Sequence, residues 1–121
     1  MNEKRLDWEK VASLAGFSAE ESGEIFAELW QEFLTAFPHS HLALEKAVAA
    51  SDTKRTQLTA HLLKGMSNNL GAFRLGAFYA EIEEKAKAGS GKKALFEQLI
   101  GQAAKEYTEL SSEVRTSLKA A

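Results

Sequence analysis

The stretch "TAHLLKGMSNNLGAF", Thr59 to Phe73, decides the fold, because it is either one helix or a break between two helices. On a helical wheel four apolar side chains fall within roughly 120° of arc, namely Leu58, Leu62, Met66 and Leu70. Their period does not reset at Gly65. We therefore predict one helix that runs through the glycine, with this stripe facing the core and Leu63 just beyond it.

His61 lies about 100° from Leu62 on the same wheel, which predicts that it faces water. Its neighbours on that side are Gln57, Lys64, Gly65 and Asn68. Glycine inside a helix lowers stability by roughly 1 kcal/mol relative to alanine, so the presence of Gly65 requires a structural or functional explanation. We predict that it leaves an opening over the imidazole for a partner, while Lys64 attracts an anionic group. Two alternatives stay open, namely that His61 is ordinary solvated surface and that Gly65 serves helix packing.

The residues before this stretch also have the pattern of helices. A short helix fits Leu6 to Ala15. Ser18 and Glu21 have the spacing of a capping box, which opens a second helix. Its apolar stripe comprises Ile25, Phe26, Leu29, Trp30, Phe33, Leu34 and Phe37. Pro38 follows, and a separate, shorter helix fits Leu42 to Ala50, with Leu44 and Val48 inward.

The helix that contains His61 can be capped by Ser51 or Asp52. The next helix has the stripe Leu75, Phe78, Ile82 and Ala86. A turn, "AGSGKK", spans Ala88 to Lys93, and the last helix carries Leu95, Leu99, Ala103, Leu110 and Leu118. Four long amphipathic helices with short connections predict an all-α, antiparallel up-down four-helix bundle. We expect one or two extra short helices in the N-terminal half, and one domain over residues 1–121 with a core of about 7–118.

Composition narrows the classes of function. The 121 residues carry a formal net charge of -2, which argues against non-specific nucleic-acid binding. Cysteine is absent, which excludes disulfides and thiolate chemistry. No apolar run approaches the roughly 20 residues of a membrane span. The start, "MNEKRLDWEK", lacks the apolar core of a secretory signal. We expect a cytoplasmic protein without membrane or nucleic-acid partners.

The segment Ala60 to Ala72, "AHLLKGMSNNLGA", resembles the signature of histidine-containing phosphotransfer (HPt) domains. Nine residues stand in register with that signature, namely His61, Leu63, Lys64, Gly65, Ser67, Asn69, Leu70, Gly71 and Ala72. Downstream, Leu75 and the pair Ile82-Glu83 are similar to the next helix of the family. Met66 departs from the pattern, because the family prefers a small residue there.

The resemblance implies a role for each residue around the histidine. His61 would accept a phosphoryl group through Nε2, and Glu83 would orient the ring from the neighbouring helix. Lys64 would offset phosphate charge, and Gly65 would admit the partner. Gln57, Asn68, Ala60 and Phe73 would contact the partner. Part of the first helix, such as Trp8, Val11 or Leu14, is a further contact candidate, or the helix simply caps the bundle.

The resemblance also implies the partners. They would be response-regulator receiver domains and a hybrid sensor histidine kinase, and the domain would act as a monomer. The receiver would supply the aspartate that donates or accepts the phosphoryl group. It would also supply the Mg²⁺, because this sequence shows no cluster of carboxylates suited to bind that ion. The chain would be a phosphocarrier rather than an enzyme, with no cofactor of its own and with a separate kinase as donor. The alternative is a helical adaptor that binds receiver or other signalling domains without phosphorylation.

Other motifs carry weaker signals. "GSGKK", Gly89 to Lys93, lacks the spacing and the preceding strand of a phosphate-binding loop. His39 and His41 have no third metal ligand nearby in sequence, which favours a surface loop. Ser67, six residues after His61, points elsewhere, so a Ser-His nucleophile pair is not expected. The Glu-x-x-His pairs of metal-binding bundles are missing.

Overall fold

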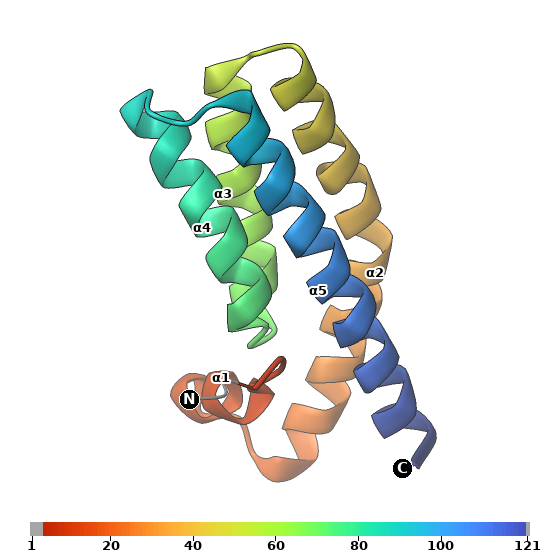
Figure 1. The fold of residues 1–121 in the computed structure, drawn as a ribbon. Helices are drawn as coiled ribbons and strands as arrows, with labels where there is room; N and C mark the ends of the chain where they lie inside the picture. Colours follow the sequence, from red (N-terminus) through yellow and green to blue (C-terminus); the bar gives the residue numbers. More distant parts are fainter. Residues whose placement is uncertain (1–3, 121) are drawn as a thin grey trace.

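The computed structural model describes residues 4–120, with side chains through residue 117. This part of the chain folds into five α-helices without strands. They are α1 (Trp8–Ala15), α2 (Ala19–Ala49), α3 (Thr53–Asn69), α4 (Phe73–Ala88) and α5 (Lys93–Ala120). In Figure 1, α2 to α5 run alternately up and down, and α1 lies across the end of the α3–α4 pair. The predicted all-α four-helix bundle is confirmed, with one extra short helix.

The helix ends follow the local chemistry of the sequence. At the start of α2, the Ser18 side chain accepts from the Glu21 N–H while the Glu21 carboxylate accepts from the Ser18 N–H, as a capping box requires. Asp52 caps α3 by accepting from the Arg55 N–H at 3.0 Å. Asp7 caps α1, so that helix begins two residues later than predicted.

The predicted break at Pro38 is wrong, because α2 runs through Pro38. The whole helix is 31 residues long. Proline removes one helical hydrogen bond, at a cost of about 3 kcal/mol. The ring of Pro38 is exposed, so it disturbs only the outer face of the helix. Phe37 before it and Leu44 after it are buried in the same core. Burial on both sides of the proline offsets the lost hydrogen bond, and the two predicted helices are one.

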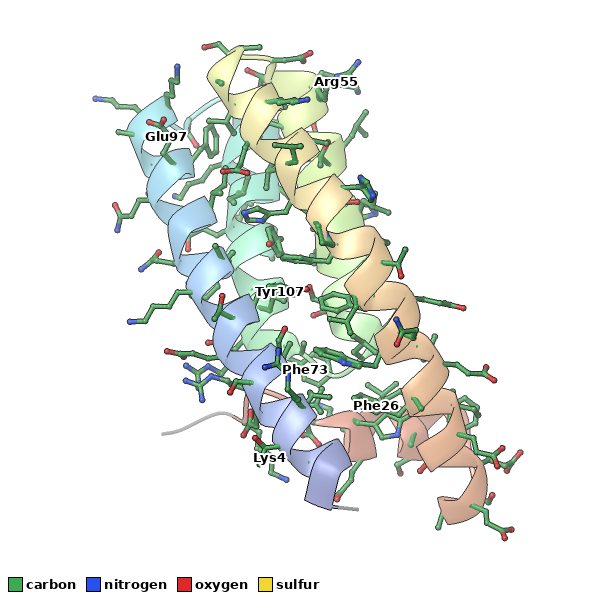
Figure 2. All side chains as sticks on the ribbon, turned by 90° about the vertical axis from the view of Figure 1, so that its right-hand side faces the viewer. Lys4, Phe26, Arg55, Phe73, Glu97 and Tyr107 are labelled. Carbon is green, nitrogen blue, oxygen red and sulfur yellow. The ribbon has the colours of Figure 1, made fainter. Side chains whose placement is uncertain are left out.

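An aromatic column fills the space between α2 and α5. Its α2 members are Phe26, Trp30, Phe33 and Phe37, each in ring contact with the next. Tyr107 of α5 stacks on Phe37 with ring centroids 4.0 Å apart. Figure 2 shows Tyr107 and Phe26 pointing into the strip between these two helices. The predicted α2 stripe is confirmed at its centre, where Trp30, Phe33 and Phe37 are buried.

The face of α3 that was predicted to be buried is largely exposed. Leu58 and Leu62 are 55% and 53% exposed, and Met66 is only half-buried. Of the predicted stripe only Leu70 is buried. The core face consists of Leu70 together with Thr56, Ala60, Leu63 and Ser67. Thr56 and Ser67 donate their hydroxyls to carbonyls one turn back in α3, at 2.8 Å each. This satisfies their polar groups within the core, so hydrophobicity alone did not reveal the buried face.

Small side chains on this face allow α4 to approach α3 closely. Gly76 of α4 is buried, and a Cβ there would collide with the side-chain oxygen of Asn68 on α3. In α4 the predicted Leu75, Ile82 and Ala86 are buried, and Phe78 is half-buried. Tyr79 is fully buried, although the stripe did not include it.

In α5, the predicted Leu99, Ala103 and Leu110 are buried and Leu95 is partly buried. The side chain of Leu118 lies outside the described residues. The turn before α5 is confirmed, because α4 ends at Ala88 and Gly89 takes a left-handed φ of 68°. Within the described part of the chain, no helix is long and apolar enough to cross a membrane.

The segment before α1 is tied to the bundle end. The Asp7 N–H donates to the Gly71 carbonyl at 2.8 Å, and a side chain on Gly71 would collide with the Asp7 backbone. Arg5 pairs with the buried Glu106 of α5 at 3.4 Å. Trp8 donates to the Ser22 carbonyl at 3.1 Å and packs on Phe26. These contacts support the alternative in which α1 caps the bundle.

Candidate functional site

His61 stands at the middle of α3, on the side of the helix that faces α4. Its side chain is 66% exposed, so the prediction that it faces water is confirmed. Ala60, just before it, is fully buried in the core. The rigid bundle therefore holds the backbone of His61 while the imidazole remains accessible from solvent.

Glu83 of α4 reaches across to the histidine. Its Oε2 lies 2.7 Å from His61 Nδ1, so the acidic partner that the resemblance implied is in contact with the ring. Glu83 is only 17% exposed, because it sits in the seam between the two helices. The close approach of α3 and α4 at Gly76, two turns away along α4, brings the short carboxylate side chain within reach.

Lys64 contacts the other oxygen of the same carboxylate. Its Nζ lies 2.6 Å from Glu83 Oε1. Lys64 is one turn after His61 on α3, so both side chains project toward α4. One carboxylate thus joins the lysine and the histidine in a chain of two short, charge-assisted contacts.

The charge state of Glu83 decides which imidazole nitrogen is free. Desolvation opposes its ionisation, but the hydrogen bonds and charges of Lys64 and His61 outweigh this, so the pKa of Glu83 lies below its ordinary value. Glu83 is therefore ionised at neutral pH and can only accept hydrogen bonds. The 2.7 Å contact then requires the proton to sit on Nδ1 of His61. In the neutral ring Nε2 is left with its lone pair.

Gly65 lies beside the histidine on open surface. A Cβ built there would meet nothing within 4 Å. Packing within the described chain therefore gives no reason for glycine, whereas alanine would strengthen the helix by roughly 1 kcal/mol. The packing alternative for Gly65 is not supported, and clearance for an outside group stays as a prediction.

The other predicted contact residues lie in different surroundings. The prediction for Ala60 is wrong, because its side chain has no exposed surface for a partner to touch. Asn68 is directed against Gly76 of α4. Phe73 lies at the α1 end of the bundle, where Lys10 Nζ sits 5.4 Å from its ring centroid. Gln57 is half-buried one turn before His61.

A groove beside the histidine was not predicted from the sequence. It lies between α2 and α3, and its volume is about 330 Å³. It is lined by Leu29, Glu32, Phe33, Ala36, Ser40, Leu62, Met66, Asn69 and Leu70. The apolar residues at positions 58, 62 and 66 could have indicated this groove. The sequence of α3 also contains a second stripe of small residues that could form the core, which would leave the apolar stripe free to line a surface. The exposed stripe belongs to the surface that adjoins His61.

The weaker motifs have structural roles. His41 places Nδ1 3.1 Å from the Tyr79 hydroxyl and stacks on Phe37, so it is part of the core edge rather than of a loop. Burial lowers the pKa of His41. His39 is exposed, on α2 as well. Ser67 is buried and bonded to the Leu63 carbonyl. Over the residues that the structure describes, no three acidic or histidine side chains gather to hold a metal ion.

Comparisons with known proteins agree with this geometry. Residues 28–113 match the family described as "Hpt domain". The crystal structure of histidine-containing phosphotransfer protein B (HptB) from Pseudomonas aeruginosa PAO1 is similar over 99% of both chains, with a TM-score of 0.79 and 27% identity. Among curated proteins no match is found. The family match covers most of the chain and includes α3 with His61, so this protein belongs to the Hpt domain family and is a histidine phosphotransfer module of a phosphorelay.

Proposed function

We propose that His61 is the phosphoryl-accepting residue of this module and that Nε2 is the reacting atom. The observation that carries the proposal is the 2.7 Å contact between His61 Nδ1 and Glu83. It leaves Nε2 as the unprotonated nitrogen on an exposed ring. His39 is also exposed, and His41 is bonded to Tyr79, but among the described residues neither has a carboxylate contact of this kind.

The transfer step follows from this arrangement. The Nε2 lone pair attacks the phosphorus of an aspartyl phosphate, an N–P bond forms, and the P–O bond to the aspartate breaks. The aspartate leaves as a carboxylate with its electron pair. The Nδ1 proton stays on the ring, which becomes positively charged, and Glu83 stabilises that charge. The reverse step returns the phosphoryl group to another aspartate.

The reacting aspartate and the Mg²⁺ belong to a receiver domain in this proposal. Phosphoryl transfer depends on positioning and on neutralising the oxygens of the transferred group, which Mg²⁺ does. This domain would supply the nucleophile, its orienting carboxylate and the clearance at Gly65. It is a phosphocarrier that completes its active site only with the partner, and a hybrid sensor kinase would be the upstream source of phosphate.

The receiver would dock on the exposed ridge of α3. Leu58, Leu62 and Gly65 lie on the outer side of this helix, between His61 and the groove against α2. A receiver that brings its aspartate to Nε2 would cover this ridge, and apolar contacts there would supply affinity. The surface differs from the predicted one, because it replaces Ala60 and Phe73 with Leu58 and Leu62.

The decisive experiment is phosphoryl transfer from phosphorylated receiver domains to the wild type, to His61→Gln and to the matched control His39→Gln. We expect an acid-labile adduct of one phosphoryl group by intact mass on the wild type and the control alone. All three should bind the receivers equally and retain their helicity. Binding without any adduct would favour the adaptor alternative, and an adduct on His61→Gln would overturn the assignment of the site.

A further inference from the structure

The contact between Lys64 and Glu83 indicates a different role for the lysine from the one expected from the sequence. The sequence suggested that Lys64 neutralises phosphate, which requires an ammonium group directed at the space around Nε2. In the structure Nζ lies 2.6 Å from Glu83 Oε1, and the lysine side chain is 30% exposed. Its charge is therefore already engaged by the carboxylate that orients the histidine.

We propose that Lys64 is a positioning residue that acts through Glu83 and keeps that carboxylate in contact with Nδ1 of His61. The inference rests on the proposed function of His61. Glu83 can rotate about its side-chain bonds, and a second contact on Oε1 keeps Oε2 aimed at Nδ1.

The consequence of losing Lys64 follows from which groups are in contact. Glu83 from α4 contacts the His61 ring, and Lys64 from α3 contacts Glu83. From α2, Glu32 lines the groove on the other side of the α3 ridge. Without Lys64, Glu83 would lose the contact on Oε1 and could turn away from Nδ1, so the proton would no longer be held on Nδ1 and Nε2 would less often be the free nitrogen.

The first test follows the ring nitrogens of His61 by ¹⁵N NMR, which needs no phosphoryl donor and reports which nitrogen of the neutral ring carries the proton. Lys64→Met should lower the share of the form with the proton on Nδ1, because Glu83 is held less firmly against that nitrogen. Lys64→Arg should restore most of the wild-type share. Lys54→Met removes the same charge from α3 about two turns away and should leave the share unchanged. An unchanged share in Lys64→Met would overturn the proposal.

The second test separates an effect through Glu83 from a direct effect on the phosphoryl group. The rate of phosphorylation by phosphoramidate, a small phosphodonor, is measured for the wild type, Lys64→Met, Glu83→Gln and the double variant. Lys64→Met should slow the reaction about two- to threefold, because Glu83 orients the ring less well without it. In the Glu83→Gln background the same substitution should have no further effect.

An equal slowing by Lys64→Met in both backgrounds would overturn the proposal, because Lys64 would then act on the phosphoryl group directly. Failure of the proposed function looks different. In that case neither phosphoramidate nor a phosphorylated receiver would label the wild type at His61. The ¹⁵N NMR measurement would still report whether Lys64 acts on the histidine.

Discussion

The α2–α5 interface and the α3–α4 interface are built from opposite kinds of side chain. Between α2 and α5, large aromatic rings stack from Trp30 to Phe37 and onto Tyr107. Between α3 and α4, small residues such as Ala60 and Gly76 bring the helices together. The aromatic side buries more apolar area per residue, and the small-residue side positions Glu83 against His61. Stability and chemistry are thus concentrated on different sides of one bundle.

Removing a ring from the aromatic column should have the largest effect on stability. Phe37→Ala should lower the free energy of unfolding by about 3–5 kcal/mol, because Phe37 is buried and contacts Phe33, Tyr79 and Tyr107. Urea titration followed by circular dichroism measures the loss. Leu42→Ala, at an exposed leucine of the same helix, should change it by no more than about 0.5 kcal/mol. A loss below about 1 kcal/mol for Phe37→Ala would contradict the division of roles.

Separating α3 from α4 should affect stability less and phosphorylation more. Gly76→Val should cost about 1–3 kcal/mol, because the added side chain displaces Asn68 and widens the seam. Phosphorylation of the folded variant by phosphoramidate should slow, since Glu83 moves away from Nδ1. Gly101→Val on α5 is the matched control, where an added Cβ meets nothing within 4 Å. If both variants react at the wild-type rate, the seam does not position the site.

The smallest effect concerns the charge of Glu83. Its pKa is lowered in the folded protein, so its ionised form contributes stability above the unfolded pKa of about 4.3. That contribution is lost as pH falls through the lowered folded value. Glu83→Gln should therefore cost below about 1 kcal/mol at pH 7 and progressively less toward pH 3. Urea titrations of both proteins across this range measure the difference, and a gap that widens on acidification would reverse the sign of the prediction.

Most helix boundaries were predictable because the signals are local. The Ser18–Glu21 capping box, the Asp52 cap and the turn at Gly89 depend on residues within one turn of each other. Pro38 led to a wrong prediction because the hydrogen bond that it removes is a local cost. The burial that offsets this cost comes from packing against the other helices. A rule that considers only neighbours in sequence ends α2 too early.

The site was predictable to the extent that the motif specifies it. The resemblance named His61, Lys64, Gly65 and Glu83, and the structure brings all four together. Leu62 and Leu63 show where the residues alone were insufficient. A helical wheel cannot tell an apolar stripe that faces the core from one that faces a groove, and here Leu63 is fully buried while Leu62 is half exposed. The side of α3 with Leu58 and Leu62 was therefore assigned to the interior, although it is exposed.

The groove between α2 and α3 has a pharmacological consequence. Its volume of about 330 Å³ lies at the lower end of the range of about 300–1,000 Å³ for small-molecule pockets. It opens beside Leu62, on the far side of the α3 ridge from Glu83. On the proposed docking of a receiver to the α3 ridge, a compound seated there would obstruct that partner without reacting with the histidine. Its selectivity would come from side chains such as Glu32 and Met66, rather than from the phosphohistidine chemistry that related carriers share.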